Sequence, residues 1–473
     1  RVAGGTVNSD DAIEDLGSLQ ANGLSAWLAT LLLTLSEKAA FQPPTVARGC
    51  AGLGPAPVVK FSSRGCRSKR PVHMDVKEDW EGEAPMPRAG PGAKSGGRGS
   101  ARGHGRGKAQ PAEEDMEQDE ATVTSTELLT SKITGSSSMA EVLQLYRQHI
   151  HQFDSIHLSA FWNVLGKLAT KDRKWRKKHA AAEGALRRAV LELMPECGGR
   201  ECANVAHGMA KAGVHSRGEW AAVWDKVTSE IAGHVSELNS QGLANTLWAF
   251  ATAGHEAPEV FAACAQQIAK SFAEFRPQGI SNTAWAYAKA GHKGPEFFTA
   301  LEDASAAGWL REFDSQHLAN LAWACATLEH RAPKLFEAIA QEASGRMHEF
   351  TSQGLANLAW AYAKLGPEVP GLFEALATEA AKRMDEFNPQ GLANIATAFA
   401  KVRHAAPYLF KALAAQVTKR ASHFTSQDLA NMAWAFAKVG HKAPEVFEAI
   451  AGVAIGCAHK FNAQDISNTA WAF

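Results

Sequence analysis

From residue 138 to the end of the chain, apolar residues recur at helical spacing, and strand-like alternation is almost missing. In the segment SQGLANTLWAFATAGHEAPEVF, which begins at Ser240, the side chains of Leu243, Leu247 and Phe250 fall on one side of a helix. A second apolar stripe begins at Phe261, after a loop that contains Gly and Pro. The pattern therefore predicts a pair of helices, each with one face buried.

Close copies of this segment recur along the chain. A shared Gln returns every 37 or 38 residues, at positions 241, 278, 316, 353, 390, 427 and 464. Two weaker copies precede them, over Phe153–Ala169 and Cys202–Gly213. A constant period of this size is typical of a solenoid in which each unit buries its apolar face against its neighbours. We therefore predict an all-α, right-handed superhelical solenoid of stacked helical hairpins, with eight full units and a shortened ninth.

Each unit contains signals for where its helices begin and end. The residues expected to cap the first helix are Asn239, Asp314, Thr351, Asn388, Thr425 and Asn462, with Arg276 as an exception. The first helix is expected to end at a left-handed glycine, namely Gly254, Gly291, Gly366 or Gly440. The second helix is expected to open at Pro258, Pro295, Pro333, Pro370, Pro407 and Pro444.

The other side of the first helix carries polar and aromatic residues in register. Gln241, Asn245, Trp248 and Thr252 share this side, and other units place Lys at the last position. A hydrogen-bonding amide, a stacking ring and a cation suit single-stranded nucleic acid. The candidate RNA-binding residues are Gln241, Asn245, Gln278, Asn282, Gln316, Asn320, Gln353, Asn357, Gln390, Asn394, Gln427, Asn431, Lys167, Lys211, Lys289, Lys364, Lys401 and Lys438.

Each member of this pattern also has a structural explanation. A Trp beside alanines is more often packed between repeats, an Asn can bond neighbouring backbone, and a Lys in the last helical turn is favoured by the helix dipole. From Glu201 onward, 22 Lys and Arg stand against 26 Asp and Glu, so a phosphate-binding surface must be a local stripe. The basic cluster Lys171–His179 either extends that stripe or forms a solvated helix face.

Base choice would require positions that differ between units, because a residue repeated in every unit cannot distinguish one base from another. The varying positions are Gly242, Gly279, His317, Gly354, Gly391, Asp428 and Asp465, together with the caps Asn239, Arg276, Asp314 and Thr351. Four of the first seven are Gly and offer no side chain, so any code is expected to be sparse.

The region before the repeats has a different composition. We divide the chain into residues 1–135, expected to be disordered, residues 138–200, a degenerate repeat with a basic helix, and residues 201–473, the repeat array. The first region contains the Arg-Gly tract Gly90–Lys108 and the acidic block Glu113–Glu120, which offer little apolar surface to bury. The Arg-Gly tract either contacts RNA backbones or is a solvated linker whose charges the acidic block balances. A basic, Ser-containing stretch over residues 38–74 is compatible with an organelle transit peptide, although Asp10, Asp11, Glu14 and Asp15 lie where a basic start is expected.

The repeat resembles the octotricopeptide repeats of algal organellar proteins. The resemblance rests on L-A-N-x-x-W-A-x-A-K-x-G-H-x-x-P-E-x-F and covers residues 150 to 473. Thr397, His207 and Asn163 depart from it at the Trp position. The resemblance implies sequence-selective binding of plastid or mitochondrial transcripts, with the plastid preferred, in RNA stability, processing or translation. A C-terminal RAP domain, found in some members, would lie beyond the given sequence.

Three functions compete on the sequence alone. The first is a solenoid that binds single-stranded RNA, and the second is a scaffold that binds protein, which the near-neutral charge favours. Catalysis is the weakest, because His255, His292, His330, His404 and His441 occur once per unit in loops. We expect no catalytic residues, no cofactor, no metal, no small-molecule substrate and no membrane partner. The seven scattered cysteines suggest reduced thiols.

Overall fold

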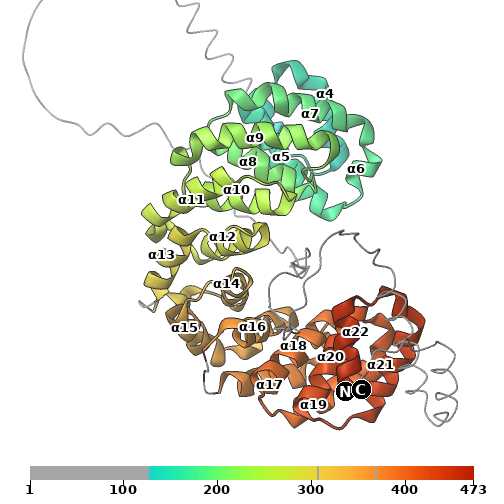
Figure 1. Cartoon of the computed structure of the whole chain (residues 1–473). Helices are drawn as coiled ribbons and strands as arrows, with labels where there is room; N and C mark the ends of the chain where they lie inside the picture. Colours follow the sequence, from blue (N-terminus) through green and yellow to red (C-terminus); the bar gives the residue numbers. More distant parts are fainter. Residues whose placement is uncertain (1–126, 306–307, 368, 370) are drawn as a thin grey trace, which may run out of the picture. The chain divides into compact units, whose positions relative to one another are not determined.

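The computed structural model describes residues 127–305, 308–367, 369 and 371–473, and every regular element in these ranges is a helix (Figure 1). From residue 132 onward the described chain belongs to one compact unit. No helix in the described ranges is both long and apolar enough to cross a membrane. The expected transit peptide, Arg-Gly tract and acidic block lie outside the described residues.

The repeat array consists of two sets of helices. The first helices of the units are α5 (Ser155–Lys171), α8 (Gly199–Lys211), α10 (Ser240–Ala253), α12 (Pro277–Ala290), α14 (Ser315–Thr327), α16 (Ser352–Leu365), α18 (Pro389–Val402), α20 (Ser426–Val439) and α22 (Ala463–Ala472). The second helices are α7 (Glu183–Leu193), α9 (Ala221–His234), α11 (Pro258–Lys270), α13 (Pro295–Ser305), α15 (Pro333–Ser344), α17 (Leu372–Lys382), α19 (Pro407–Arg420) and α21 (Pro444–Cys457). Before and within the first unit lie α4 (Met139–His149) and the short α6 (Trp175–Lys178).

Each helix packs on its counterpart in the neighbouring unit. First helices contact first helices from α5 through to α22, and second helices contact second helices from α7 through to α21 (Figure 1). Leu243, Leu247 and Phe250 of α10 are fully buried, as their spacing predicted. The all-α solenoid of stacked hairpins is therefore confirmed.

The folded part begins earlier than the sequence analysis placed it. Residues 127–134 are helical, although disorder was expected up to residue 135. Leu129 and Ile133 lie one helical turn apart in this segment, which gives it the apolar face that the preceding Gly-rich and acidic tracts do not have. Next along the chain, the predicted Ser cap of α4 is confirmed, since Ser138 accepts the backbone N–H of Glu141 at 3.2 Å.

The predicted N-terminal caps are confirmed in the repeats. In six units the cap side chain accepts the backbone N–H three residues later, and Arg276 caps nothing with its side chain; the six are Asn239, Asp314, Thr351, Asn388, Thr425 and Asn462. Glycine at the donating position leaves room for the cap: a Cβ on Gly391 would approach Asn388 Oδ1 to 3.1 Å. The caps therefore fix the start of each first helix.

Two predicted boundaries differ from the structure. Gly254, Gly291 and Gly440 are left-handed as expected, but Gly366 is extended (φ −65°, ψ 149°). Pro367 follows Gly366, and a residue before proline is pushed toward extended backbone. The expected helix start at Pro370 lies outside the described residues, and α17 begins at Leu372. The other five prolines open their helices as predicted.

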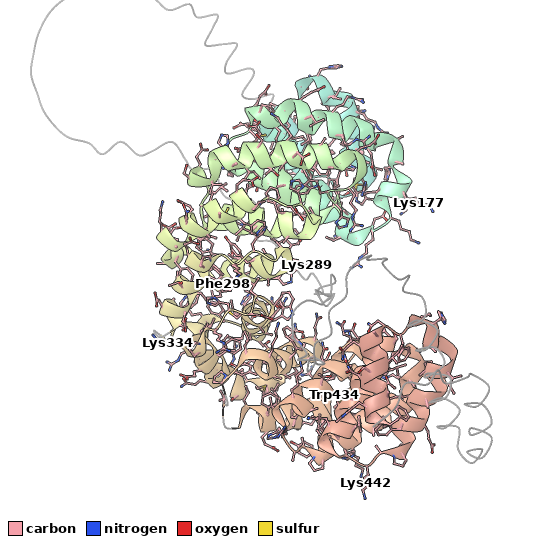
Figure 2. The ribbon with its side chains drawn as sticks, in the orientation of Figure 1. Lys177, Lys289, Phe298, Lys334, Trp434 and Lys442 are labelled. Atoms are coloured by element: carbon pink, nitrogen blue, oxygen red, sulfur yellow. The ribbon has the colours of Figure 1, made fainter. Side chains whose placement is uncertain are left out.

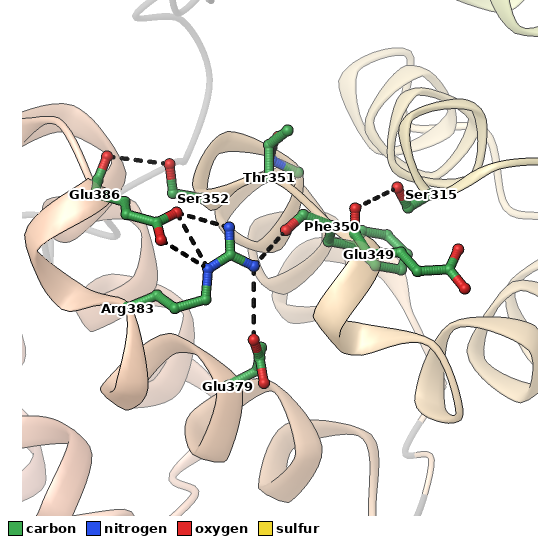
Figure 3. Close-up of polar contacts among 9 residues, drawn as sticks. Ser315, Glu349, Phe350, Thr351, Ser352, Glu379, Arg383 and Glu386 are labelled. Atoms are coloured by element: carbon green, nitrogen blue, oxygen red, sulfur yellow. Dashed lines mark hydrogen bonds and ion pairs between the residues drawn. The ribbon is translucent and has the colours of Figure 1, made fainter.

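An arginine clasp joins successive units directly beside the first-helix caps, since Phe350 precedes the cap Thr351. The guanidinium of Arg383 donates to the carbonyl of Phe350 in the preceding unit at 2.8 Å, and it is also paired with Glu386 (Figure 3). Nearby, Ser352 Oγ donates to the carbonyl of Glu386 at 3.1 Å. Arg346 makes the same contacts with Phe313 and Glu349 one unit earlier. These bonds set the stacking distance of the units independently of apolar packing.

Candidate nucleic-acid interface

Three rows of residues on the first helices are named here by residue type, and the candidate Gln residues form a separate row. The Asn ladder is Asn204, Asn245, Asn282, Asn320, Asn357, Asn394, Asn431 and Asn468; the Trp ladder is Trp248, Trp285, Trp323, Trp360, Trp434 and Trp471; and the Lys ladder is Lys167, Lys211, Lys289, Lys364, Lys401 and Lys438. Because first helices pack side by side, equivalent residues of successive units become neighbours. The stacking thus produces the three rows.

The Asn ladder lies deep between neighbouring first helices. Asn245, Asn320 and Asn357 are buried, and the others that were predicted to bind RNA are half-buried. Asn320 Nδ2 donates to Ser281 Oγ of the preceding unit at 3.3 Å, and Asn204 Nδ2 donates to Ser159 Oγ at 3.2 Å. A hydrogen bond to neighbouring backbone is the structural role that the sequence suggests for this Asn. In these two units the amide bonds to a serine side chain instead.

Where the preceding unit has Ala in place of that Ser, the amide loses this partner. Asn245 follows Ala203 and Asn282 follows Ala244, one unit away in each case. Asn245 Oδ1 and Asn282 Nδ2 are buried without a hydrogen-bond partner. A buried amide atom without a partner costs about 1–3 kcal/mol, so a new partner for these atoms would stabilise the units.

The Trp ladder divides into buried and accessible members. Trp248 and Trp323 are buried, in line with packing between repeats, whereas Trp285, Trp360 and Trp434 are half-buried and Trp471 is 59% exposed. The rings of Trp434 and Trp471 lie 6.5 Å apart with an angle of 38° between their planes. The structure therefore supports both predicted roles, stacking surface and inter-repeat packing, in different units.

The Gln row lies in the first turn of each first helix. Gln316 and Gln427 are exposed, while Gln241, Gln278, Gln353 and Gln390 are half-buried. The amide groups thus stand at the opposite end of the helix from the Lys ladder, and a ligand that touched both would cross the helix obliquely.

The Lys ladder occupies the last turn of the first helices. Lys167, Lys364, Lys401 and Lys438 are exposed, and Lys211 and Lys289 are half-buried. Partial desolvation, and then repulsion by the charge of Lys364 in the preceding unit, lower the pKa of Lys401. Two ammonium groups lie over rings of the Trp ladder: Lys364 Nζ is 5.3 Å from Trp360 and Lys438 Nζ is 5.9 Å from Trp471.

Charge is divided between the two sets of helices. Helices α10, α12, α14, α16 and α18 contain no Asp or Glu, and the single acid of α20, Asp428, is held in a capping box with Thr425. Carboxylates gather instead on the second helices and in loops, for example Glu374 and Glu379 on α17. Figure 2 shows Lys289 at the end of α12, and Lys334 on the second-helix side at α15. The sequence is nearly neutral overall, but its first helices form a face on which positive charges predominate.

In the two weak units the ladder positions are filled differently. His207 stands at the Trp position of α8, its ring 5.2 Å from that of Trp248. Burial, together with the charges of Lys211 and Lys167, lowers the pKa of His207 to about 3, so the imidazole is neutral at physiological pH. Lys167 and Lys211 thus both lie near His207, and an imidazole replaces the stacking indole ring in α8.

The basic cluster Lys171–His179 combines residues that anchor α6 with residues exposed to solvent. Trp175 is buried and donates to the carbonyl of Ala212 at 2.8 Å, and Arg176 is paired with Glu183 at 2.8 Å. Lys178 is paired with Asp172 at 2.7 Å, whereas Lys171, Arg173, Lys174 and Lys177 are exposed to solvent (Figure 2 labels Lys177). Part of the cluster therefore serves to attach α6 to its surroundings.

The positions proposed for base choice are largely occupied by capping. Asn239 accepts the N–H of Gly242, Asp314 that of His317, and Thr351 that of Gly354. Asp428 and Asp465 bond back to the N–H groups of Thr425 and Asn462 and are buried. These side chains hold helix ends and have little freedom to read a base.

The recurring histidines serve packing between units. Each begins the loop after a first helix, where its N–H bonds to the carbonyl five residues earlier, as for His292 and Tyr287 at 3.0 Å. The ring then lies against an aromatic residue of the preceding unit, with 4.3 Å between the ring centres of Phe261 and His292. In the described ranges, no group of three His, Cys, Asp or Glu side chains could hold a metal ion.

Sequence reasoning missed Glu329. It occupies the left-handed position that Gly291 and Gly440 fill in other units, with φ 56°, and its carboxylate lies 3.3 Å from Lys364 Nζ. A comparison of the ends of the units would have found it, because ATLEH stands where other units have AKAGH or AKVGH.

Comparison with protein families places the repeat array in a known family. The model of the family RESC6, described as RNA-editing substrate-binding complex 6 protein, matches residues 149–385 and 379–473. The two matched ranges together cover the repeat array from its first unit onward.

Proposed function

Because the chain belongs to the RESC6 family, we propose that it binds single-stranded RNA along its first helices, as the RNA-contacting part of a larger RNA-processing complex. The family differs from the octotricopeptide repeats that the motif suggested, so that resemblance holds only for a helical-repeat family associated with RNA. The family description supports RNA and protein partners together.

One observation carries the RNA proposal: the first helices combine amides, indole rings and ammonium groups on a face from which carboxylates are almost missing. The Lys ladder provides charge for phosphates, and the accessible members of the Trp ladder provide surfaces for stacking. Each stacked base is worth roughly 1–3 kcal/mol. Because the side chains at the varying positions form helix caps, we propose that the protein binds the RNA backbone and stacked bases with limited sequence selectivity.

RNA binding can be tested with the whole chain and a pool of random-sequence RNA at two salt concentrations. Replacing Lys289, Lys364, Lys401 and Lys438 by Ala should lower affinity and reduce the slope of log K against log salt by about 2, at roughly 0.7 per phosphate contact, because Lys364 is already paired with Glu329. The matched control replaces four exposed lysines of the second helices, Lys334, Lys382, Lys411 and Lys419. Equal losses in both variants would contradict a specific track.

A protein partner is supported by a groove between α19 and α21. The groove has a volume of about 860 Å³ and is lined by Tyr408, Lys411, Lys419 and Lys442, with Glu445 as its carboxylate. Unlike α17, helix α19 contains no acidic residue. We therefore propose that an acidic segment of a partner protein binds there. An oligoglutamate peptide should bind in a fluorescence anisotropy assay, and Lys411/Lys419/Lys442→Ala should abolish that binding.

We place this activity in an organelle, and we favour the mitochondrion over the plastid that the sequence suggested, because the RNA-editing complex of the matched family is mitochondrial. We also propose that the chain binds RNA without catalysing a reaction on it, since the recurring histidines are engaged in packing. Fractionation of cells that express the tagged full-length protein would test the location.

A further inference from the structure

We infer that the RNA-binding face is interrupted at α14, so that RNA is held by two separate cationic tracks. The inference rests on the proposed function, and it adds that the RNA-binding face is divided into two tracks. The N-terminal track contains Lys167, Lys211 and Lys289, and the C-terminal track contains Lys364, Lys401 and Lys438. Four features of the α14 unit support the interruption, three of them at ladder positions and the fourth at Glu329, two residues beyond the Lys position.

The first two features concern charge. Thr327 stands at the Lys position of α14, so this unit contributes no ammonium group. Two residues later, the Glu329 carboxylate is 74% exposed and lies 3.3 Å from Lys364 Nζ. A carboxylate so placed neutralises the first cation of the C-terminal track and repels a phosphate that would pass from α12 to α16.

The other two features concern the groups that would contact bases. The Asn320 amide already donates to Ser281 Oγ, unlike Asn282 Nδ2, which has no partner. Trp323 is only 5% exposed, whereas the rings of Trp285 and Trp360 on either side are half-buried. The amide and the ring of this unit are therefore both withdrawn from a ligand.

The carboxylate is not explained by the fold. At φ 56° Glu329 adopts a conformation that is unfavourable for any residue with a Cβ, and Gly takes this position in four other units, as Gly213, Gly254, Gly291 and Gly440. Arg403 takes the same conformation in α18, where its positive charge continues the C-terminal track. Residues of opposite charge thus occupy one strained position, in keeping with a role toward a ligand.

Helix α10 shares with α14 a buried ring, since Trp248 is buried like Trp323, but it lacks the carboxylate and the engaged amide. Thr252 also replaces Lys there, but the left-handed residue is Gly254 and Asn245 Oδ1 has no partner. That unit weakens the N-terminal track without adding a negative charge. The ligand expected from this arrangement is RNA with two single-stranded stretches, joined by a segment that does not contact α14.

The inference can be tested with the whole chain and a random-sequence RNA of about 30 nucleotides. Glu329→Gln should raise affinity at low salt by roughly three- to tenfold and steepen the salt slope by about 0.7, because Lys364 becomes available to a phosphate. Thr327→Lys should steepen the slope by a similar amount. Ultraviolet crosslinks should appear on peptides of α12 and α16 in the wild type, and also on α14 in the double variant.

Matched controls separate this inference from the proposed function. Glu337→Gln on α15 and Thr418→Lys on α19 make the same chemical changes on the second-helix side and should leave the salt slope unchanged. Glu329→Gly removes the carboxylate while relieving the backbone, and so keeps the fold in case Gln disturbs it. If Lys401→Ala weakens binding but the Glu329 and Thr327 variants do nothing, the interruption is refuted and RNA binding stands. If the wild type binds no RNA, both fail.

Discussion

The side-chain amide of Asn320 donates a hydrogen bond to Ser281 Oγ in the preceding unit, at 3.3 Å. Both residues are buried, so the bond joins α12 to α14 inside their interface. Equivalent pairs elsewhere are mostly Asn and Ala, which makes this contact a property of a particular unit. Its contribution to the free energy of unfolding can be measured by removing the serine from this unit and by introducing one in another unit.

Ser281→Ala should destabilise the array, because Asn320 Nδ2 would be left buried without a partner, at a cost of about 1–3 kcal/mol. Ala244→Ser should instead stabilise it by about 1 kcal/mol, since the new hydroxyl can accept from Asn282 Nδ2. Urea denaturation followed by hydrogen exchange of α12 and α14 would measure both. A loss of stability in both variants would mean that the serine site cannot be transferred between units.

The arginine clasp predicts a stabilising substitution at His423. Arg346 and Arg383 each pair with a Glu three residues later, but Arg420 has His423 there, and its Nε and Nη2 are buried without a partner. His423→Glu should supply that partner and raise the free energy of unfolding by about 1 kcal/mol. Thermal unfolding would show a higher Tm, and the same gain in an Arg420→Lys background would exclude the clasp as its cause.

Arg403 predicts a gain from relief of backbone strain. It ends α18 at φ 56°, where Gly440 ends α20 at φ 68°. Arg403→Gly should raise stability by about 0.5–1 kcal/mol, and Gly440→Arg should lower it by a similar amount. Chemical denaturation checks both. Arg403→Gly should also weaken RNA binding slightly, which a stability effect alone would not produce.

His207 predicts loss of stability in acid. Its folded pKa of about 3 lies below the ordinary value of 6.5, so the unfolded chain takes up this proton first. Its contribution is therefore complete above pH 6.5 and is lost as the pH falls toward 3, with a slope of at most about 1.4 kcal/mol per pH unit. His207→Phe should flatten this part of the pH profile. An unchanged profile would mean that other groups dominate acid unfolding.

The sequence alone determined the repeat, its helices and most of their ends. Periodicity of 37 or 38 residues, caps such as Asn239 and prolines such as Pro258 act locally, and local geometry follows from residue type and its immediate neighbours. Gly366 shows the limit of this reasoning even at short range, because the following Pro367 overrides the expected left-handed end.

Only the tertiary structure decided which members of each row are available. Trp248 and Trp434 occupy the same place in the repeat, yet one is buried and the other is half-buried, because exposure depends on the neighbouring unit. The Asn320 amide is engaged because Ser281 lies 39 residues away in sequence but adjacent in the stack. The pairing of Glu329 with Lys364 likewise exists only when α14 and α16 lie side by side. The repeated sequence therefore predicts a regular face, and contacts between units determine where that face can bind.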